Sequence, residues 1–564
     1  MNTQSNYTIG IDFGTESGRA LLVDVSNGRE LATAVHLYAN GVIDQTLPES
    51  NITLEPDWAL QDPADYIAVL QTTIPAVLQE SGVDPSDVIG IGLDFTSCTM
   101  LPTTTDGTPL CQLPDYRSEP HAWVKLWKHH AAQPEADQIN ALAIERGEAW
   151  LPLYGGIISS EWFFSKALQI LDEAPHIYHA ADRLIEAGDW VIWQLTAQEV
   201  RSSCMAGYKA MWQKEEGFPS NEFLAALHPA FEHVVDQKMT REIAALGTKA
   251  GGLTAEAAAW MGLPAGVAVA VAGIDAHMSV PPAKANDPGT MVMIMGTSTC
   301  HMVVSDERKL VPGLSGVVED GIVPGTFGYE AGQAAVGDIF GWFVDNAVPP
   351  LYHEEAARQG VSVHELLEAE AAKQKPGQHG LLALDWWNGC RSTLVDAELS
   401  GVLVGATLAT TAPDIYRALI ESTAFGTRAI IDAMTENGVP VNHIVAAGGL
   451  PERNKLLLQI YADVTNREFS VVRSGQAAAL GAAMHGAVAA GADAGGYDDL
   501  VAAADRMGGL KDEVYRPIPD NVAVYDQLYA DYQMLYEYFG RGEKAGNNNV
   551  MKRLRALRHA ALTG

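Results

Sequence analysis

The chain has 564 residues, 47% of them hydrophobic, and carries 36 Lys and Arg against 70 Asp and Glu, a formal net charge of −34. One hydrophobic core rarely serves a chain of this length, so we expect two large domains. The strong acidity argues against nucleic-acid and anionic-membrane partners, which carry the same sign of charge. No run of 18 apolar residues occurs, so the sequence predicts no membrane span.

The cysteines are few and scattered, at positions 98, 111, 204, 300 and 390. None forms a Cys-x-x-Cys pair, so neither a zinc site nor a disulfide framework is indicated. The first residues are polar and lead directly into an apolar stretch, without the pattern of a secretory signal. We therefore expect reduced thiols and a cytoplasmic location. The sequence does not fix the oligomeric state, and homo-oligomer formation stays open.

The first predicted unit covers residues 8–25, where two apolar stretches flank a short turn that contains glycine. This pattern predicts a strand, a tight turn and a second strand. Glycine lets backbone N–H groups approach a phosphate, and hydroxyl groups add donors. The candidate phosphate-binding residues are Gly14, Thr15, Glu16 and Ser17. Asp12 ends the first strand and is a candidate magnesium ligand, the alternative being a turn-capping Asp in an ordinary hairpin.

The same pattern returns at residues 291–304, where Gly296, Thr297 and Ser298 separate two apolar stretches. Two such turns indicate two similarly built domains, each of which offers a phosphate loop to a shared cleft. A third element covers residues 443–455, in which an apolar strand ends at Gly448 and Gly449 before a predicted helix. A double glycine at that junction lets a flat ring or a phosphate lie against the backbone. Asn454 follows in the same segment.

Between the two hairpins, strands are predicted over 30–38 and 88–93 and a helix over 64–79. The strand over 88–93 leads into a turn that contains Thr96 and Ser97. Ligands of open α/β sheets lie beyond the carboxyl ends of strands, so these two hydroxyls are candidate substrate contacts. A capping turn is the alternative. Residues 112–215 are rich in tryptophan and predict an inserted helical subdomain with most of these rings in its core.

Three charged residues follow in apolar or glycine-rich surroundings. Lys209 lies in an apolar run, where a cation needs a partner or a ligand, the alternative being a surface lysine. A strand over 267–272 is expected to begin the second domain, just before Asp275, whose carboxylate can accept a proton from a hydroxyl or cap the next helix. Glu330 precedes a predicted helix over 334–344 and is a candidate hydroxyl acceptor or a first-turn acid.

The remaining predicted helices cover 414–434, 452–464, 476–490 and 522–538, and the stretch 385–393 predicts a loop at the cleft edge. Residues 542–549 interrupt the helical pattern, and a basic segment follows with Lys552, Arg553, Arg555 and Arg558. We expect this segment to form a terminal helix on an acidic surface. The predicted division is an N-terminal domain over 1–270, a C-terminal domain over 271–505 and a helical tail over 506–564.

The two Gly-Thr hairpins and the Gly-Gly loop resemble those of the actin/hexokinase/Hsp70 superfamily, and within it the chain resembles the FGGY carbohydrate kinases. The C-terminal pattern of that family is nearly matched over 401–421, with departures at Ala406 and Leu419. The first family signature, around Lys166, matches less well because its usual Trp is missing. Further matches to L-ribulose-phosphorylating members cover 119–130, 205–211, 273–277, 329–333 and 385–389.

This resemblance implies an α/β fold in which two actin-like, ribonuclease H-like domains flank a catalytic cleft. It implies ATP-dependent phosphorylation of L-ribulose at its 5-hydroxyl in L-arabinose catabolism. The alternatives are another ketopentose, a pentitol or glycerol, or a non-catalytic ATPase on the same scaffold. ATP would be held by the two hairpins and the Gly-Gly loop, with Asn454, and magnesium by Asp12 and Asp275.

In the same resemblance Asp275 falls at the place of the catalytic base. The sugar contacts that it implies are Thr96, Ser97, Lys209, Asp275 and Glu330. No Gly-x-x-x-x-Gly-Lys-[Ser/Thr] segment occurs, and no Gly-x-Gly-x-x-Gly follows the first strand. The sequence therefore argues against a Walker-type ATPase and against a dinucleotide enzyme.

Overall fold

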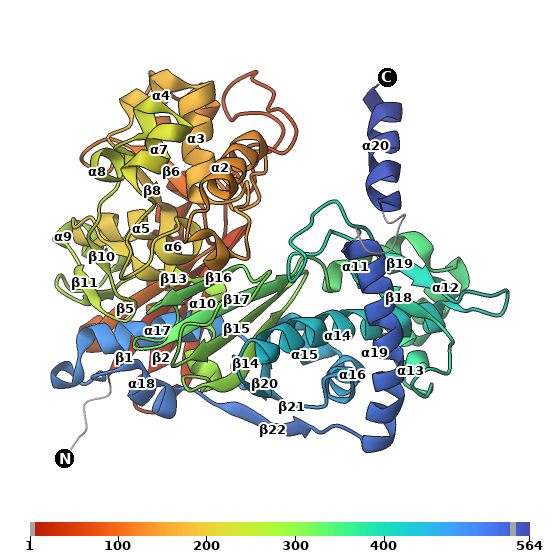
Figure 1. Ribbon diagram of the computed structural model, residues 1–564. Coiled ribbons are helices and arrows are strands. Elements are labelled where there is room, and N and C mark those ends of the chain that lie inside the picture. The colour runs from red at the N-terminus through yellow and green to blue at the C-terminus, as the bar shows by residue number, and fades with distance from the viewer. Residues whose placement is uncertain (1–5, 542–548, 564) are drawn as a thin grey trace, which may run out of the picture.

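The computed structural model describes residues 6–541 and 549–563. Two seven-stranded sheets form the centres of its two halves, and helices cover them (Figure 1). The first sheet has the order β11(Lys249–Gly252)-β12(Ala268–Ala270)-β5(Val88–Phe95)-β1(Tyr7–Phe13)-β2(Ser17–Asp24)-β3(Glu30–Leu37), with β13(Gly273–Ile274) beside β5. The second has the order β16(Gly316–Glu319)-β17(Phe327–Gln333)-β15(Thr299–Ser305)-β14(Gly289–Met295)-β20(Val441–Ala447)-β21(Glu468–Val472)-β22(Leu510–Tyr515).

The two sheets share one topology around their hairpins. In the first, β1 is antiparallel to β2 and parallel to β5. In the second, β14 is antiparallel to β15 and parallel to β20. A third antiparallel strand extends each hairpin, β3 beside β2 and β17 beside β15. The predicted pair of similarly built α/β halves is therefore confirmed.

The strand predicted over 267–272 does not begin the second half. It forms the short β12, and both β12 and β13 pair in parallel with β5 of the first sheet. The chain crosses to the second sheet only after α10(Asp275–Met278) and enters it at β14. A parallel neighbour stabilises such a short strand, and periodicity alone does not show which sheet supplies that neighbour.

Helix α17(Ala477–Ala490) returns from the C-terminal half and packs against β1 and β5 of the first sheet. The contact requires glycine in β1, since a Cβ atom on Gly10 would stand 1.8 Å from the Ala479 carbonyl oxygen. The small side chains that the sequence shows in this helix therefore allow two backbones to approach closely.

The predicted insertion contains helices and contributes two strands, β7(Val124–Lys125) and β8(Arg183–Glu186), to a small four-stranded sheet that we did not predict. Its helices include α2(Gln133–Arg146), α3(Phe163–Glu173), α4(Pro175–Ala180), α5(Ala187–Thr196) and α6(Ser203–Lys209). The sheet has the order β4(Leu60–Gln61)-β7-β6(Met100–Thr103)-β8. Five of its tryptophans are buried, at 123, 162, 190, 193 and 212, as expected of core residues. Beyond it follow α7(Asn221–Leu227), α8(Val234–Lys238) and α9(Ala255–Met261), and β10(Ile243–Ala244) pairs in parallel with β9(Arg201–Ser202) of the insertion.

Most predicted helices occur near their expected positions, as α1(Pro63–Ser81) and α14(Ala412–Glu436) do. The helix predicted over 452–464 is instead divided into α15(Gly449–Arg453) and α16(Lys455–Thr465). Asn454 is extended between them, and its side chain accepts a hydrogen bond from Leu457 N, which caps the second helix. Further elements are α11(Gly337–Ala347), α12(Pro350–Gln359), α13(Val363–Ala371), β18(Leu382–Leu384), β19(Val402–Val404) and α18(Leu500–Met507).

The C-terminal tail docks through α19(Pro519–Gly540), which buries four tyrosines, at 525, 529, 532 and 536. The interruption predicted over 542–549 lies almost wholly outside the described residues. Beyond it, α20(Val550–Thr563) extends away from the end of α19 (Figure 1). Lys552 forms ion pairs with Asp396 at 2.7 Å and Glu398 at 3.5 Å, so the basic segment does lie on acidic residues. Among the described helices, none has the length and apolar character needed to cross a bilayer.

Candidate active site between the two sheets

The first hairpin turn is fixed by neighbours from the N-terminal half. Gly14 N donates to Ser17 O at 2.9 Å, and Tyr38 Oη donates to Gly14 O at 2.9 Å. Trp127 Nε1 donates to Thr15 Oγ1 at 3.0 Å, which leaves the Thr15 hydroxyl proton available to a ligand. The Glu16 side chain is exposed. Hydrogen bonds from Tyr38 and Trp127 therefore hold the turn in place, and the Glu16 side chain faces solvent.

The second hairpin turn is fixed by the start of α11. Gly296 N donates to Ser298 O at 2.9 Å, while Val336 N and Asp338 N donate to Thr297 O at 2.7 and 3.2 Å. No atom lies closer than 3.9 Å to the place of a Cβ on Gly296, so this side of the turn faces open space. The two predicted phosphate turns differ in length, because four residues, 14–17, connect the paired strand ends in the first and three, 296–298, in the second. Each turn closes through a hydrogen bond donated by its glycine N–H.

The two glycines of the Gly-Gly loop have different surroundings. Gly448 has φ of +97°, and a Cβ there would stand 2.5 Å from Met295 O, so β14 packing requires glycine. Around Gly449 no atom lies within 4 Å of the place of a Cβ, so only Gly449 leaves room for a ligand. Asn454, which we expected at the nucleotide, uses its side chain to cap α16.

Two acids meet where the first sheet ends. Asp12 on β1 and Asp94 on β5 are register partners at the carboxyl ends of parallel strands. Burial raises the pKa of Asp12, against the opposing effect of Arg19, whose Nε lies 3.3 Å from Asp12 Oδ2. Asp94 is 0% exposed, and burial together with the Asp12 carboxylate raises its pKa well above the usual value. Neither Asp94 oxygen has a hydrogen-bond partner among the described residues.

Asp94 is a site residue that the sequence reasoning missed. The available signal was an acid at the end of a buried strand predicted to lie parallel to the strand of Asp12. Asp275 completes this edge, because β13 pairs with the end of β5 and Asp275 follows β13 directly. It is the first residue of α10 and not its N-cap, and its Oδ1 accepts from Ala276 N at 2.7 Å.

The environment of Asp275 suits a base. Burial first, and then the carboxylates of Asp12 and Glu330, raise its pKa to about 7, while the Ala276 N–H and Lys209 act in the opposite direction. A carboxylate with such a pKa is partly ionised at neutral pH and still accepts a proton readily. These are the two properties that proton removal from a sugar hydroxyl requires.

A second cluster connects the two halves. Lys209 Nζ, on α6, donates to both oxygens of Glu330, on β17, at 2.9 and 3.0 Å. Lys209 is 5% exposed, so the surface-lysine alternative is wrong. Glu330 stands within a strand and not before a helix, so the first-turn alternative is wrong as well. Burial opposes the ionisation of Glu330, but Lys209 and His277 hold its pKa well below the usual range.

His277 and Cys204 belong to this cluster, although the sequence reasoning did not select them. His277 Nε2 lies 3.2 Å from Glu330 Oε2, and its Nδ1 lies 3.2 Å from Cys204 Sγ. The only sequence signal was the place of His277 two residues after Asp275 in a matched family segment. Burial lowers the pKa of His277, against the opposing effect of Glu330. The ring therefore holds Glu330 in position through a short polar contact.

The turn after β5 lies beside Lys209 but uses its two hydroxyls differently. Thr96 is buried, and its Oγ1 lies 3.0 Å from Thr99 Oγ1, which fits the capping-turn alternative. Ser97 is half-buried, with its Oγ 3.7 Å from Cys98 Sγ, a weak contact that a ligand can replace. Lys209 acts to lower the pKa of the Cys98 thiol against the larger effect of burial, so the turn lies in the neighbourhood of the Lys209–Glu330 cluster.

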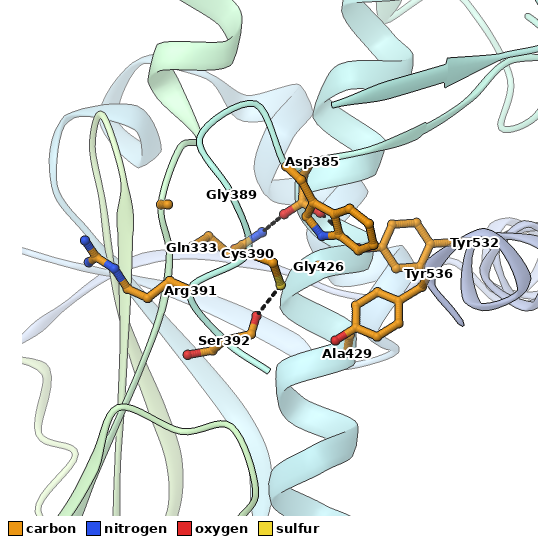
Figure 2. A pocket seen from close by; sticks show the side chains of 12 residues that line it. Gln333, Asp385, Gly389, Cys390, Arg391, Ser392, Gly426, Ala429, Tyr532 and Tyr536 are labelled. Atoms are coloured by element: carbon orange, nitrogen blue, oxygen red, sulfur yellow. Dashed lines mark hydrogen bonds between the residues drawn. The ribbon is translucent and has the colours of Figure 1, made fainter. Parts of the chain in front are cut away.

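The loop over 385–393 was predicted at the cleft edge without a role. Asp385 accepts hydrogen bonds from Gln333 Nε2 at 2.7 Å and from Tyr532 Oη at 2.9 Å, so the loop is fastened to β17 and to α19. Figure 2 shows the small pocket beside it, whose lining includes Tyr532, Tyr536 and Arg391, with the Arg391 guanidinium on the other side of the loop from the two tyrosine rings.

The residues at which the chain matches the two family signatures have mainly structural contacts. Lys166 is buried and donates to Cys98 O and Leu126 O, both at 2.7 Å. Glu421 is buried and accepts from Arg417 Nε at 2.8 Å and from Tyr525 Oη at 2.8 Å. These residues hold the turn after β5 and the tail helix, and they do not contact the acids of the cleft edge directly.

The two halves share one topology, and each has a short glycine turn of the kind that holds phosphates. They meet at a buried acidic edge. This arrangement defines a two-domain sugar kinase of the actin/hexokinase type. Models of the FGGY family of carbohydrate kinases match residues 7–280 with the N-terminal domain and 291–490 with the C-terminal domain. The chain belongs to the FGGY family of carbohydrate kinases and is a phosphotransferase.

Relatives of known name cover nearly the whole chain. A ribulokinase of Geobacillus thermodenitrificans is 59% identical over 98% of both chains. A ribulokinase of Mycolicibacterium smegmatis is 54% identical over 98% of this chain and 97% of its own. Among solved structures, the xylulose kinase of Rhodospirillum rubrum superposes with a TM-score of 0.76 at 23% identity, covering 94% of this chain and 98% of its own. This last likeness concerns the fold alone.

Proposed function

We propose that the chain transfers the γ-phosphoryl group of ATP to the 5-hydroxyl of L-ribulose, with Asp275 as the general base. The assignment of the sugar follows the relatives named ribulokinase at 54–59% identity. The single observation that supports the base is the position of Asp275 at the shared edge of both halves, in surroundings that raise its pKa to about 7.

In this proposal Asp275 takes the proton of the sugar hydroxyl as its oxygen attacks the γ-phosphorus. Phosphoryl transfer depends mainly on positioning and on the stabilisation of charge, and a base within hydrogen-bond reach completes the nucleophile. Closure of two halves around the substrates excludes water, which would otherwise accept the phosphoryl group.

The Lys209–Glu330 pair is proposed to bind the sugar hydroxyls, with Ser97 and the turn at Thr96 beside it. Lys209 offers a donor and Glu330 an acceptor, and His277 holds Glu330 in place. The pair joins α6 of the first half to β17 of the second. A sugar bound there contacts both halves and favours their closed arrangement by its greater affinity for that arrangement.

ATP is proposed to lie across the two hairpin turns, with its phosphates on the Gly14–Ser17 and Gly296–Ser298 segments and its adenosine over Gly449. The open space beside Gly296 and Gly449 supports this position. We propose that Asn454 acts indirectly, because its capping of α16 fixes the junction that follows the Gly-Gly loop.

The residues of the acidic edge fit a magnesium ion. Asp94 offers buried oxygens without partners, and Asp12 stands beside them in register. Magnesium prefers one or two carboxylates together with water and phosphate oxygens, so the small number of protein ligands suits it. We propose that Asp12, with Asp275 nearby, holds this ion, which when bound would neutralise phosphate charge.

We also propose a domain division that follows the sheets, with the boundary between β13 and β14 and not at residue 270. The N-terminal domain then ends near Ile274, and the tail begins after β22 at Tyr515. Because α17 packs on the first sheet, the division in sequence and the division in space differ.

Replacement of Asp275 by Asn tests the base, because Asn keeps the size of the side chain but accepts no proton. We expect kcat to fall by about 10²–10⁴-fold with nucleotide binding nearly kept. Steady-state kinetics and calorimetric titration measure the two quantities. A near-normal kcat in the folded variant would remove Asp275 from the mechanism.

A panel of sugars in a coupled assay of ADP release tests the substrate. L-ribulose should give the highest kcat/KM, ahead of xylulose, ribitol and glycerol. Faster turnover of another of these would move the chain to a different FGGY activity. Equal ATP hydrolysis with and without every sugar would favour the non-catalytic alternative instead.

A further inference from the structure

Arg391 stands in the loop over 385–393, whose backbone is held from two sides. Ser392 Oγ accepts a hydrogen bond from Gly332 N of β17 at 3.1 Å. Asp385 is joined to Tyr532 of α19 at 2.9 Å. Figure 2 shows the Arg391 side chain on the opposite side of the loop from Tyr532. A fixed backbone therefore presents a cationic side chain to the side that faces away from the tail helix.

The Arg391 stem crosses the second sheet beside its phosphate turn. A Cβ atom on Gly332 would stand 3.0 Å from Arg391 Cδ and 3.3 Å from Thr299 O. Thr299 begins β15 directly after the turn, and Gly332 pairs with Cys300, the next residue of that strand. Glycine at 332 thus provides the space in which the arginine lies, close to Gly296–Ser298.

The guanidinium reaches from the second half towards the inserted subdomain of the first. Its Nη2 lies 3.9 Å from Glu161 Oε1, a separation beyond hydrogen-bond range. Burial opposes the charge of Arg391, but Glu161, Cys300 and Glu330 raise its pKa above the ordinary value. The side chain is therefore a charged group with a loose partner.

The other cations of the cleft lie closer to their acidic partners than Arg391 does. Lys209 makes two hydrogen bonds to Glu330, at 2.9 and 3.0 Å. Arg19 Nε lies 3.3 Å from Asp12 Oδ2, in the first half. A transferring phosphoryl group carries negative charge on three oxygens, and arginine matches this geometry with two parallel N–H groups. Arg391 is thus better able than Lys209 to exchange its partner for a phosphoryl group.

We propose that Arg391 is a catalytic residue that leaves Glu161 and binds the phosphoryl group while it passes from ATP to the sugar. In this step the bond from the γ-phosphorus to the bridging oxygen of ADP breaks, and a bond to the sugar oxygen forms. The sugar proton goes to Asp275, and Arg391 exchanges no proton. The proposal rests on the proposed kinase activity and adds a charge-stabilising group to it.

Three variants test this role: Arg391→Gln, Arg391→Lys and, as the matched control, Glu161→Gln. Each is assayed with the sugar that the unaltered enzyme turns over fastest, so that an error about L-ribulose does not affect the result. We expect Arg391→Gln to lower kcat by about 10²–10³-fold, as the loss of one preorganised charge-stabilising donor does. Arg391→Lys should recover part of the loss, since it restores the charge but not the paired donors.

The KM of the unphosphorylated sugar should change little in Arg391→Gln, whereas inhibition by the sugar phosphate product should weaken by about tenfold or more. Glu161→Gln should keep kcat within about threefold, because Glu161 is only the resting partner. Thermal unfolding confirms that each variant is folded, and added guanidinium should restore turnover in a folded Arg391→Ala variant.

Two results would overturn the proposal. One is a kcat for Arg391→Gln within threefold of the unaltered enzyme. The other is an equal loss of kcat in Arg391→Gln, in Glu161→Gln and in the double variant, because that pattern assigns Arg391 to a purely structural tie with Glu161. A poor kcat/KM for L-ribulose in the unaltered enzyme would contradict the proposed substrate and leave the comparison of variants intact.

Discussion

The two sheets repeat one topology, but they differ in the residues at the ends of the central strands. Two positions before Gly14 stands Asp12, whose register partner on β5 is Asp94. Two positions before Gly296 stands Ile294, whose register partner on β20 is Ala447. The same edge is therefore acidic and buried in the first half and apolar in the second.

This difference shows how one fold divides the work of a phosphotransferase. Both halves offer a short turn that begins with glycine and that we propose to bind phosphates through its backbone. At the ends of the central strands only the first half adds carboxylates, and β13 brings Asp275 to them, whereas Glu330 of the second half lies within β17. The second half instead has Ile294 and Ala447 at this edge, and the place of a Cβ on Gly449 meets open space, over which we propose the nucleotide to lie. The fold supplies the positions, and the residue types decide which half carries the acids.

The largest expected effect follows from equivalent substitutions in the two halves. Asp12→Asn removes the charge from the acidic edge and should lower kcat by about 10²–10³-fold. Ile294→Thr, at the equivalent position of β14, should leave kcat within about threefold, because we assign no charge to that edge. Steady-state kinetics at saturating ATP measure both. Equal losses in the two folded variants would show that the halves are not chemically different.

Much of this comparison was accessible from the sequence. The repeated turns predicted two similar halves, and Lys209, Asp275 and Glu330 were selected before their contacts were known. In the structure Lys209 and Glu330 contact each other across the halves, and Glu330 contributes to the raised pKa of Asp275. Strand ends and buried charges are strong signals, because an isolated charge in an apolar run needs a partner or a function.

Other features depend on tertiary pairing that no local pattern shows. The membership of β12 and β13 in the first sheet follows from their parallel neighbour β5. Asp94 becomes notable only because β5 places it beside Asp12. Asn454 looked like a ligand in a glycine-rich segment, yet its side chain caps a helix that divides there. Arg391 gave no sequence signal beyond its place next to a matched segment.

A second comparison uses the two adjacent glycines of the second half. Gly449→Val places a branched side chain in the open space over which we position adenosine, so ATP affinity should fall by about 10–100-fold with the fold intact. Gly448→Ala should instead destabilise the protein by about 1–3 kcal/mol, since φ is +97° there and the Cβ meets Met295 O at 2.5 Å.

Calorimetric titration with a non-hydrolysable ATP analogue and chemical unfolding separate the two effects. If Gly449→Val binds the analogue as the unaltered enzyme does, the nucleotide lies elsewhere. If Gly448→Ala unfolds at the same denaturant concentration as the unaltered protein, the packing of this loop on β14 is looser than the structure shows.

The smallest expected effect is a pH dependence that comes from the acidic edge. The ordinary pKa of an aspartate is near 3.8, and burial with neighbouring carboxylates raises that of Asp275 to about 7. A base must be ionised, so kcat/KM for the sugar should be constant above pH 7 and fall about tenfold for each pH unit below it. Glu135 provides the control, because burial raises its pKa to about 7 as well, but it lies on α2 of the insertion.

Glu135→Gln should therefore keep the acid limb of the pH profile unchanged. Asp12→Asn removes the largest like charge that raises the pKa of Asp275, so its residual activity should show the limb at lower pH. Initial rates at low sugar concentration between pH 5 and 9 measure all three proteins. Two outcomes would assign the titration to a group outside the edge of the first sheet. In one, the acid limb of the pH profile moves in Glu135→Gln. In the other, it stays in place in Asp12→Asn.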